Sequence, residues 1–345
     1  PAPRGEARVA RALPRPARGD AAQYLNLKLL DLAQLCQPKP DLSRGTDIQH
    51  LATQALTIGA HTTSDFPAVL QDAANKVLEE AYGLQPSSYR VWASQRQFKD
   101  FKPHKFLRIG DFPSLTATKE PATVQWGSLG ESKQEVALAS YTSGLKFSRE
   151  ALINDDLGAL SDIGAGAAVT SARTENDLAY SVLAANPTMA DGKPLFHADH
   201  GNIAAVPSTV DVENVALATI AMRTQTAPNG QVLNLKPRTL VCGPSQELAA
   251  HRLLATIQPA TVSNVNPYSG KLELVVDANI SGNEWYLFCD PRVCATFVYG
   301  FLREADGPEV WITRDDDTRG VAFRCGLDFA VGAIDWRGCY KNAGA

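Results

Sequence analysis

The stretch that decides the fold is residues 175–202, ENDLAYSVLAANPTMADGKPLFHADHGN, where a helical pattern gives way to a long connection. Leu178 and Val182 continue an apolar stripe with helical spacing. The stripe ends at Asn186-Pro187. Because proline disfavours helical backbone in the residue before it, the helix is predicted to stop at or just before Asn186.

The same helical pattern extends backwards from this point to about residue 148. Gly158, Gly164 and Gly166 lie in its first half. Each glycine costs a helix about 1 kcal/mol relative to alanine, so this half is predicted to be kinked or to start late. The second half, which has no such glycines, is predicted to be a regular helix.

Residues 106–147 have a different pattern, with strand-like alternation of two residues. The alternation sets Val136, Leu138 and Ser140 against Ala137, Ala139 and Tyr141. This predicts paired strands. Neither face is strongly apolar, and a two-stranded ribbon is marginal alone, so the ribbon is expected to lean on another surface, such as that of another subunit.

The remaining elements make the chain a mixed α+β protein. Ser64 offers an N-cap and Gly83 an end for an amphipathic helix between them. Helical patterns recur at about 212–226 and 245–257. Strand-like runs lie at 239–241, 272–276, 285–288, 295–299, 310–313 and 321–334.

Charge is distributed unevenly in this chain of 345 residues with a net charge of −4. The first 19 residues hold one acid, Glu6, and five basic residues: Arg4, Arg8, Arg11, Arg15 and Arg18. A sequence reader of nucleic acid carries its basic surface on the folded body, so sequence-specific DNA binding is not expected. The arm is expected to be a solvated tail or to touch DNA phosphates, a scaffold or a neighbouring subunit.

The other compositional features exclude further classes. No run of about 18 apolar residues is present, so a membrane protein is excluded. Nothing near Pro1 resembles a signal peptide, and proteolytic trimming is expected to explain a start without Met. The widely spaced cysteines, with no Cys-x-x-Cys pair, are expected to be reduced thiols: Cys36, Cys242, Cys289, Cys294, Cys325 and Cys339.

The strongest candidate for catalysis is His197-x-x-His200 with Asp199 between the histidines. Two histidines three apart can share a metal, but a hydrolytic site also needs a third ligand, a base and an open position. The alternative is a loop whose His and Asp side chains hydrogen-bond nearby backbone groups and fix its shape. The loop interpretation is preferred, because Pro194 and Gly201 bound the stretch and no zincin spacing is present.

Other candidate motifs are weaker. Gly164 and Gly166 do not form a phosphate loop, because no strand precedes them and no Lys-Ser/Thr pair follows. The acidic runs Asp155-Asp156 and Asp315-Asp316-Asp317 lack the alternating oxygen ligands of a Ca²⁺ site and are expected to be solvated turns. We therefore expect no catalytic residue, no cofactor and no metal ligand, and hence no enzyme.

Several stretches in one order resemble the Mu-like bacteriophage major head subunit family over roughly residues 60–345. They are TSDFPAVL at 63–70, FSREALINDDLGA at 147–159, ENDL at 175–178, ANPTMADG at 185–192, LFHADHGN at 195–202, PYSGKLE at 267–273 and VGAIDWRGCYKN at 331–342. In this family the loop holding His197, Asp199 and His200 has no catalytic role that we can assign. Residues 21–60 also resemble the linker of members in which a prohead protease is fused ahead of the capsid domain.

The resemblance implies a Hong Kong 97-type capsid fold. It implies an N-terminal arm and linker at 1–63, an N-terminal helix region at 64–105 and an extended β-hairpin loop at 106–147. It further implies a spine helix and peripheral domain at 148–199, an axial domain at about 200–265 and a β-rich peripheral and axial remainder at 266–345.

The implied function is that of a major capsid protein assembling into pentamers and hexamers that close an icosahedral head around double-stranded DNA. The expected partners are further copies of the chain, a portal, a scaffold or prohead protease and a decoration protein, with non-specific contact to packaged DNA. The expected place is the virion, after assembly in the bacterial cytoplasm. Crosslinking through Lys119 or Lys133, known in some relatives with this fold, is not expected.

Two alternatives stay open. One is the shell of a cellular, encapsulin-like nanocompartment of the same fold, which would hold an enzyme cargo instead of DNA. The other is a metal-dependent hydrolase using His197 and His200. Gene neighbourhood separates the first from a virion, and stoichiometric metal with loss of activity in His→Ala variants would identify the second.

Overall fold

The computed structural model describes residues 66–85, 87–106, 134–147, 157–227, 230–255, 268, 270–303, 305–315 and 320–345. It divides into two compact units. The larger unit comprises residues 74–144, 163–311 and 324–345, and it contains the candidate site. The smaller comprises residues 1–73, 145–162 and 312–323. The arm, the N-cap Ser64, Cys36, Lys119, Lys133, Asp155, Asp156, Asp316 and Asp317 lie outside the described residues.

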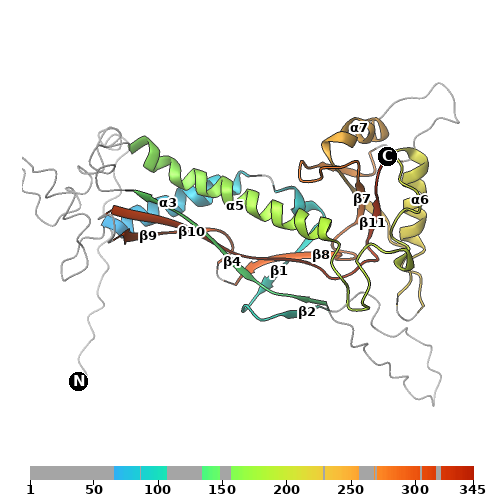
Figure 1. Cartoon of the computed structure of the whole chain (residues 1–345), viewed down its shortest axis with the longest axis horizontal. Coiled ribbons are helices and arrows are strands. Elements are labelled where there is room, and N and C mark those ends of the chain that lie inside the picture. The colour runs from blue at the N-terminus through green and yellow to red at the C-terminus, as the bar shows by residue number, and fades with distance from the viewer. Residues whose placement is uncertain are drawn as a thin grey trace, which may run out of the picture. The chain divides into compact units, whose positions relative to one another are not determined.

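The helices agree closely with the sequence pattern (Figure 1). They are α3 (Phe66–Gly83), α5 (Leu157–Ala185), α6 (Val212–Arg223) and α7 (Glu247–Leu254), with short 3-10 turns η2 (Ser88–Val91), η3 (Ala198–His200) and η4 (Pro244–Gln246). The predicted helix end before Asn186 and the late start are both confirmed. None of the described helices is both long and apolar enough to cross a membrane.

The described strands form three sheets. The strands are β1 (Ala93–Phe98), β2 (His104–Phe106), β3 (Gln134–Val136), β4 (Ala139–Phe147), β5 (Pro237–Cys242), β6 (Glu273–Val276), β7 (Trp285–Cys289), β8 (Phe297–Leu302), β9 (Glu309–Asp315), β10 (Gly320–Ala333) and β11 (Cys339–Asn342). One sheet has the order β1-β8-β10-β4, with β9 also paired to β10; a second has the order β11-β7-β5-β6; β2 and β3 pair alone. β1 and β11 were not predicted, because β1 is mostly polar and β11 is short.

Helix α5 tolerates its glycines for a packing reason. It is continuous from Leu157 to Ala185, so the predicted kink is wrong. A Cβ atom at Gly164 would lie 3.0 Å from the Ala74 carbonyl oxygen and 3.3 Å from the Val77 Cβ of α3. The missing side chain therefore lets α3 and α5 approach closely, and this contact offsets the lower helix propensity of glycine.

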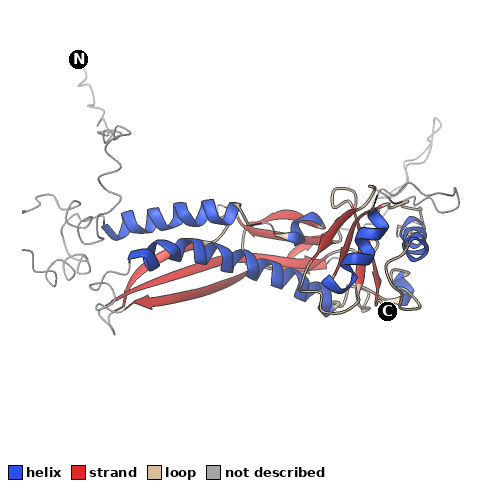
Figure 2. Cartoon of the chain, turned by 90° about the horizontal axis from the view of Figure 1, so that it is seen from above, coloured by secondary structure: helices blue, strands red, loops and turns tan. Residues whose placement is uncertain are grey.

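The β11-β7-β5-β6 sheet is buried on both faces, which explains its nearly continuous apolar strands. In β7, Trp285 and Leu287 pack with α6 and α7, whereas Tyr286 and Phe288 point to the opposite face. That opposite face packs against the C-terminal part of α5 and the connection after it. Figure 2 shows α6 and α7 beside this sheet. The 187–210 connection is thereby attached to the larger core.

The alternating run at 134–147 divides between two sheets. β2 and β3 pair antiparallel, with His104 opposite Val136, as predicted for two strands of a ribbon. β4, however, pairs with β10, so the expectation of one ribbon through residue 147 is wrong for 139–147. β3 instead covers β10, where a Cβ at Gly332 would lie 2.6 Å from Val136. Residues 107–133 lie outside the described part.

The cysteines within the described residues are free thiols, as predicted: Cys242, Cys289, Cys294, Cys325 and Cys339. All except Cys325 are buried. Burial raises the pKa of the Cys242 thiol to about 11. These side chains act as small apolar groups in the core.

Candidate functional site

The connection that follows α5 forms a small closed hairpin. Asn186 adopts a φ of 49°, which turns the chain away from the helix axis, and its side-chain oxygen accepts a hydrogen bond from the Phe196 N–H at 2.7 Å. The Met189 N–H donates to the Lys193 carbonyl at 2.7 Å, and the Leu195 N–H to the Pro187 carbonyl at 2.9 Å. Asp191-Gly192 forms the tip, with Gly192 at a φ of 80° that favours glycine.

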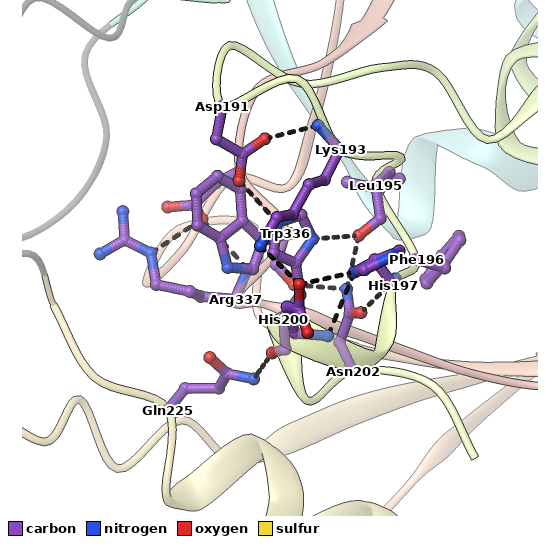
Figure 3. A network of polar contacts seen from close by, with 12 residues as sticks. Asp191, Lys193, Leu195, Phe196, His197, His200, Asn202, Gln225, Trp336 and Arg337 are labelled. Carbon is purple, nitrogen blue, oxygen red and sulfur yellow. Dashed lines mark hydrogen bonds and ion pairs between the residues drawn. The ribbon is translucent and has the colours of Figure 1, made fainter. Parts of the chain in front are cut away.

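Asn202 holds the second half of this connection, which we call the 195–202 loop (Figure 3). It is 1% exposed. Its side-chain oxygen accepts from the His197 N–H at 3.1 Å, and its nitrogen donates to the carbonyls of Leu195 at 2.9 Å and Trp336 at 3.2 Å. One buried amide thus ties the loop to itself and to the C-terminal segment.

His200 is the second anchor of the loop. Its Nδ1 lies 3.0 Å from the Leu195 carbonyl oxygen and its Nε2 2.7 Å from the Asp191 carboxylate. Its ring stacks on Trp336 with centroids 4.2 Å apart and 7° between planes. Both ring nitrogens face oxygen acceptors, and only the imidazolium form can donate to both.

Asp191 completes this anchor electrostatically. Burial raises its pKa, but the hydrogen bonds with His200 and with the Lys193 N–H outweigh burial, and the pKa lies below its ordinary value. The Lys193 ammonium pairs in turn with Asp199 at 2.5 Å. This contact lowers the pKa of the exposed Asp199 carboxyl.

The two candidate histidines do not converge. The side chain of His197 is 37% exposed and its Nδ1 accepts from the Asp199 N–H at 3.2 Å, whereas His200 is buried and fully engaged by oxygen atoms. Their ring centroids lie 6.0 Å apart. The loop interpretation, in which these side chains hydrogen-bond nearby groups and fix the loop shape, is confirmed. Within the described part of the chain, no three His, Cys, Asp or Glu side chains are grouped to hold a metal ion.

The C-terminal partner of the loop is the Asp335-Trp336-Arg337 segment, which residue spacing alone did not identify. Arg337 is 2% exposed and its Nε donates to Asp335 Oδ1 at 2.9 Å. Its guanidinium carbon lies 5.8 Å from the Trp336 ring centroid, a cation–π contact. Among the described residues, Nη1 and Nη2 find no hydrogen-bond acceptor.

A second polar cluster, the α5 cluster, lies on one side of that helix. Glu175 is fully buried and accepts from the hydroxyls of Tyr82 and Tyr89, the latter at 2.7 Å, and pairs with Arg90 at 3.2 Å. Burial, followed by the nearby Glu175 carboxylate, raises the pKa of both tyrosines well above the ordinary value. The neighbouring Asn176 donates to Asp277 at 2.7 Å.

The α5 cluster and the 195–202 loop share one property. Their polar groups point inward, bond to groups on distant chain segments and are largely withheld from solvent. Gln225, which donates to the His200 carbonyl at 2.7 Å, extends this pattern to the segment after α6. Such networks fix one arrangement of elements rather than present reactive groups to a substrate.

Comparison with known proteins agrees with this geometry. A family model described as phage capsid protein matches residues 131–342, more than half of the chain. The match includes the α5 cluster, the 195–202 loop and the Asp335-Trp336-Arg337 segment. No curated protein sequence matches the chain.

Solved structures show the shared fold. The capsid of cyanophage P-SCSP1u is 9% identical, with a TM-score of 0.51 over 76% of this chain and 89% of that one. A phage-related protein from Bordetella bronchiseptica RB50 is 15% identical, covering 78% of this chain and 95% of that one, with a TM-score of 0.47. The bacteriophage JBD30 procapsid is 16% identical, covering 82% and 77%, with a TM-score of 0.46.

The expected α+β, Hong Kong 97-type fold is therefore confirmed, and the inward-facing polar networks are features of a structural scaffold. The chain belongs to the phage capsid protein family, and it is a major capsid protein of the virion shell rather than an enzyme.

Proposed function

We propose that this chain is the major head subunit of a Mu-like tailed phage or prophage. In this proposal it assembles as pentamers and hexamers into an icosahedral shell around double-stranded DNA, in the cytoplasm of a bacterial host. The observation that carries the proposal is the ordered set of Mu-like stretches from residue 63 to residue 342, together with the capsid-family match over 131–342.

The parts of the chain are assigned accordingly. The arm and linker are residues 1–63, the N-terminal helix region 64–105 and the extended loop 106–147. The spine helix and peripheral domain are 148–199, the axial domain about 200–265 and the β-rich remainder 266–345. The uninterrupted 29-residue α5 supports the spine assignment.

The shell works without a catalytic residue, cofactor or metal ligand in this proposal. Subunits making head-to-tail contacts close into rings, and rings related by similar contacts close into a shell. A portal, a scaffold or prohead protease and a decoration protein are the proposed partners. An origin from a protease-capsid fusion follows from the resemblance of residues 21–60 to the linker of such fusions.

The contact with DNA is proposed to be non-specific. The chain carries a net charge of −4 although its first 19 residues contain five arginines, so the rest of the chain is acidic. An acidic container does not hold DNA phosphates tightly, whereas an arginine arm can contact them without reading sequence.

The experiment is negative-stain electron microscopy with size-exclusion chromatography of the purified chain, alone and with its scaffold and protease supplied. Closed shells, or free pentamers and hexamers, are expected. A matched control is the Asn202→Asp variant, which places a carboxylate against two carbonyl oxygens and is expected to prevent folding and assembly together. A chain that folds normally and stays monomeric with those partners present would contradict the proposal.

The cargo separates the virion from the nanocompartment. Shells purified from the natural source should contain DNA that resists added nuclease until the shell is opened. Shells that instead contain a stoichiometric enzyme and no DNA would establish the nanocompartment alternative.

A further inference from the structure

Strand β4 forms one border of the β1-β8-β10-β4 sheet and is unusually open. Seven of its nine residues are exposed and none is buried. Its sequence is ASYTSGLKF, with neither proline nor acid and with Lys146 as its single charge. Among the described strands, β10 is the one to which it pairs. In Figure 1, β4 runs alongside β10.

An open edge of this kind is seldom left free. Edge strands present a row of unpaired N–H and C=O groups, and proteins block them with charges, proline, bulges or short strands. The opposite border of the sheet follows this rule. β1 is shorter, carries Arg96 and buries both of its ends, Ala93 and Phe98. β4 has none of these blocking features over nine residues.

We propose that β4 pairs antiparallel with β4 of a second copy of this chain, across a two-fold axis that passes at Ser143. The inference rests on the proposed function, because a shell brings many copies of one chain together. A strand meeting its own copy makes an isologous contact, in which the same surface serves both partners.

The sequence of β4 complements itself in this register. Pairing centred on Ser143 sets residues opposite each other when their numbers are equally far from 143. Tyr141, which is half-buried against the core, then lies opposite Leu145, which is 58% exposed. An aromatic side chain opposite an aliphatic one is a favourable cross-strand pair, and the symmetry forms it twice.

The size of the contact sets when it forms. Nine extended residues span about 30 Å, and one strand pair buries far less than the roughly 1,000 Å² of a stable protein interface. The contact is therefore too weak to hold a dimer of free subunits. It forms in the shell, where many weak contacts act together.

The experiment places a charge on the axis. Ser143 is exposed, so Ser143→Lys and Ser143→Asp leave the folded subunit unchanged, and equal melting temperatures of unassembled subunits check this. Each variant alone sets like charges directly opposite each other, and shell yield is expected to fall about tenfold or more, because the clash repeats over many copies. An equal mixture of the two variants is expected to restore shells, because lysine then faces aspartate.

Three results would overturn the inference. They are normal shells from either single variant, a defect that the mixture does not relieve, and a cryo-electron microscopy map of the wild-type shell in which no second β4 lies beside the first. The map decides the matter even if the variants fold poorly. Wild-type shells without β4 pairing would leave the proposed function intact, whereas a wild-type chain that forms no shell would contradict the proposed function itself.

Discussion

Replacing His200 by alanine tests the structural role of the 195–202 loop against the metal hypothesis. The change removes the contact of Nδ1 with the Leu195 carbonyl at 3.0 Å, the contact of Nε2 with Asp191 at 2.7 Å and the stack on Trp336. His197→Ala is the matched control, because it changes the same residue type three positions away.

The magnitudes follow from these contacts. A neutral hydrogen bond contributes about 0.5–1.5 kcal/mol and one to a charged group about 1.5–3 kcal/mol. The aromatic stack adds about 0.5–1.5 kcal/mol. Because the Asp191 side chain is 31% exposed, the lower ends apply, and His200→Ala is expected to lower the free energy of unfolding by about 3 kcal/mol. His197 accepts one hydrogen bond on a 37% exposed side chain, so its loss is expected to cost less than about 1 kcal/mol.

The assay is urea unfolding of unassembled subunits, followed by tryptophan fluorescence, with and without a chelator. The His200 effect is expected to be independent of the chelator and at least about twice that of His197. Equal losses for the two variants, or losses that disappear when metal is removed, would refute the structural interpretation and favour a shared metal.

The pH dependence of the His200 effect has a defined sign. The pKa of Asp191 is lower in the folded chain than its ordinary value of about 3.9. In the window between these two values the unfolded state binds more protons, so this contribution is present above about pH 4 and is lost as pH falls through the folded pKa. The difference in stability between wild type and His200→Ala should therefore shrink below pH 4.

Three other substitutions or modifications have defined outcomes. Glu175→Ala should lower the free energy of unfolding by about 3 kcal/mol in urea unfolding, because a buried arginine and two hydroxyls lose their acceptor, whereas Glu175→Gln should lose less than half as much. Gly300→Ala should cost more than about 3 kcal/mol, since its Cβ would lie 1.9 Å from the Arg96 carbonyl oxygen. Gly166→Ala, with nothing within 4 Å, should instead raise the melting temperature through a gain of up to about 1 kcal/mol. Cys242, whose pKa is raised by burial to about 11, should stay unmodified by iodoacetamide in the native protein at pH 8 and react after unfolding, as read by mass spectrometry.

Local rules predicted the helices well. Proline acts on the residue before it, so the end of α5 could be placed from Asn186-Pro187 alone. Buried strands such as β7 are apolar in nearly every residue and were located for that reason. β1, with its polar edge sequence, gives no such periodic signal.

The candidate site was predictable in part. The 195–202 loop was located from its unusual His-Ala-Asp-His-Gly-Asn composition, and its structural role was preferred over a metal site. The partners Asp191, Trp336 and Arg337 were not assigned, because 134 residues separate Asn202 from Trp336 and no spacing rule operates over that distance. An Asp-Gly pair at 191–192 was the available signal for a turn that would bring an acid near the loop.

The sequence by itself determined the helix positions, the mixed α+β class and the family resemblance, because these depend on side-chain order along a short piece of backbone. Tertiary structure alone decided that 134–147 divides between two sheets, that Gly164 serves a helix contact, and that His200 rather than His197 is buried. Each of these depends on which distant segments meet in the core. The free energy that selects those meetings comes from burial and from satisfying polar groups across the whole chain.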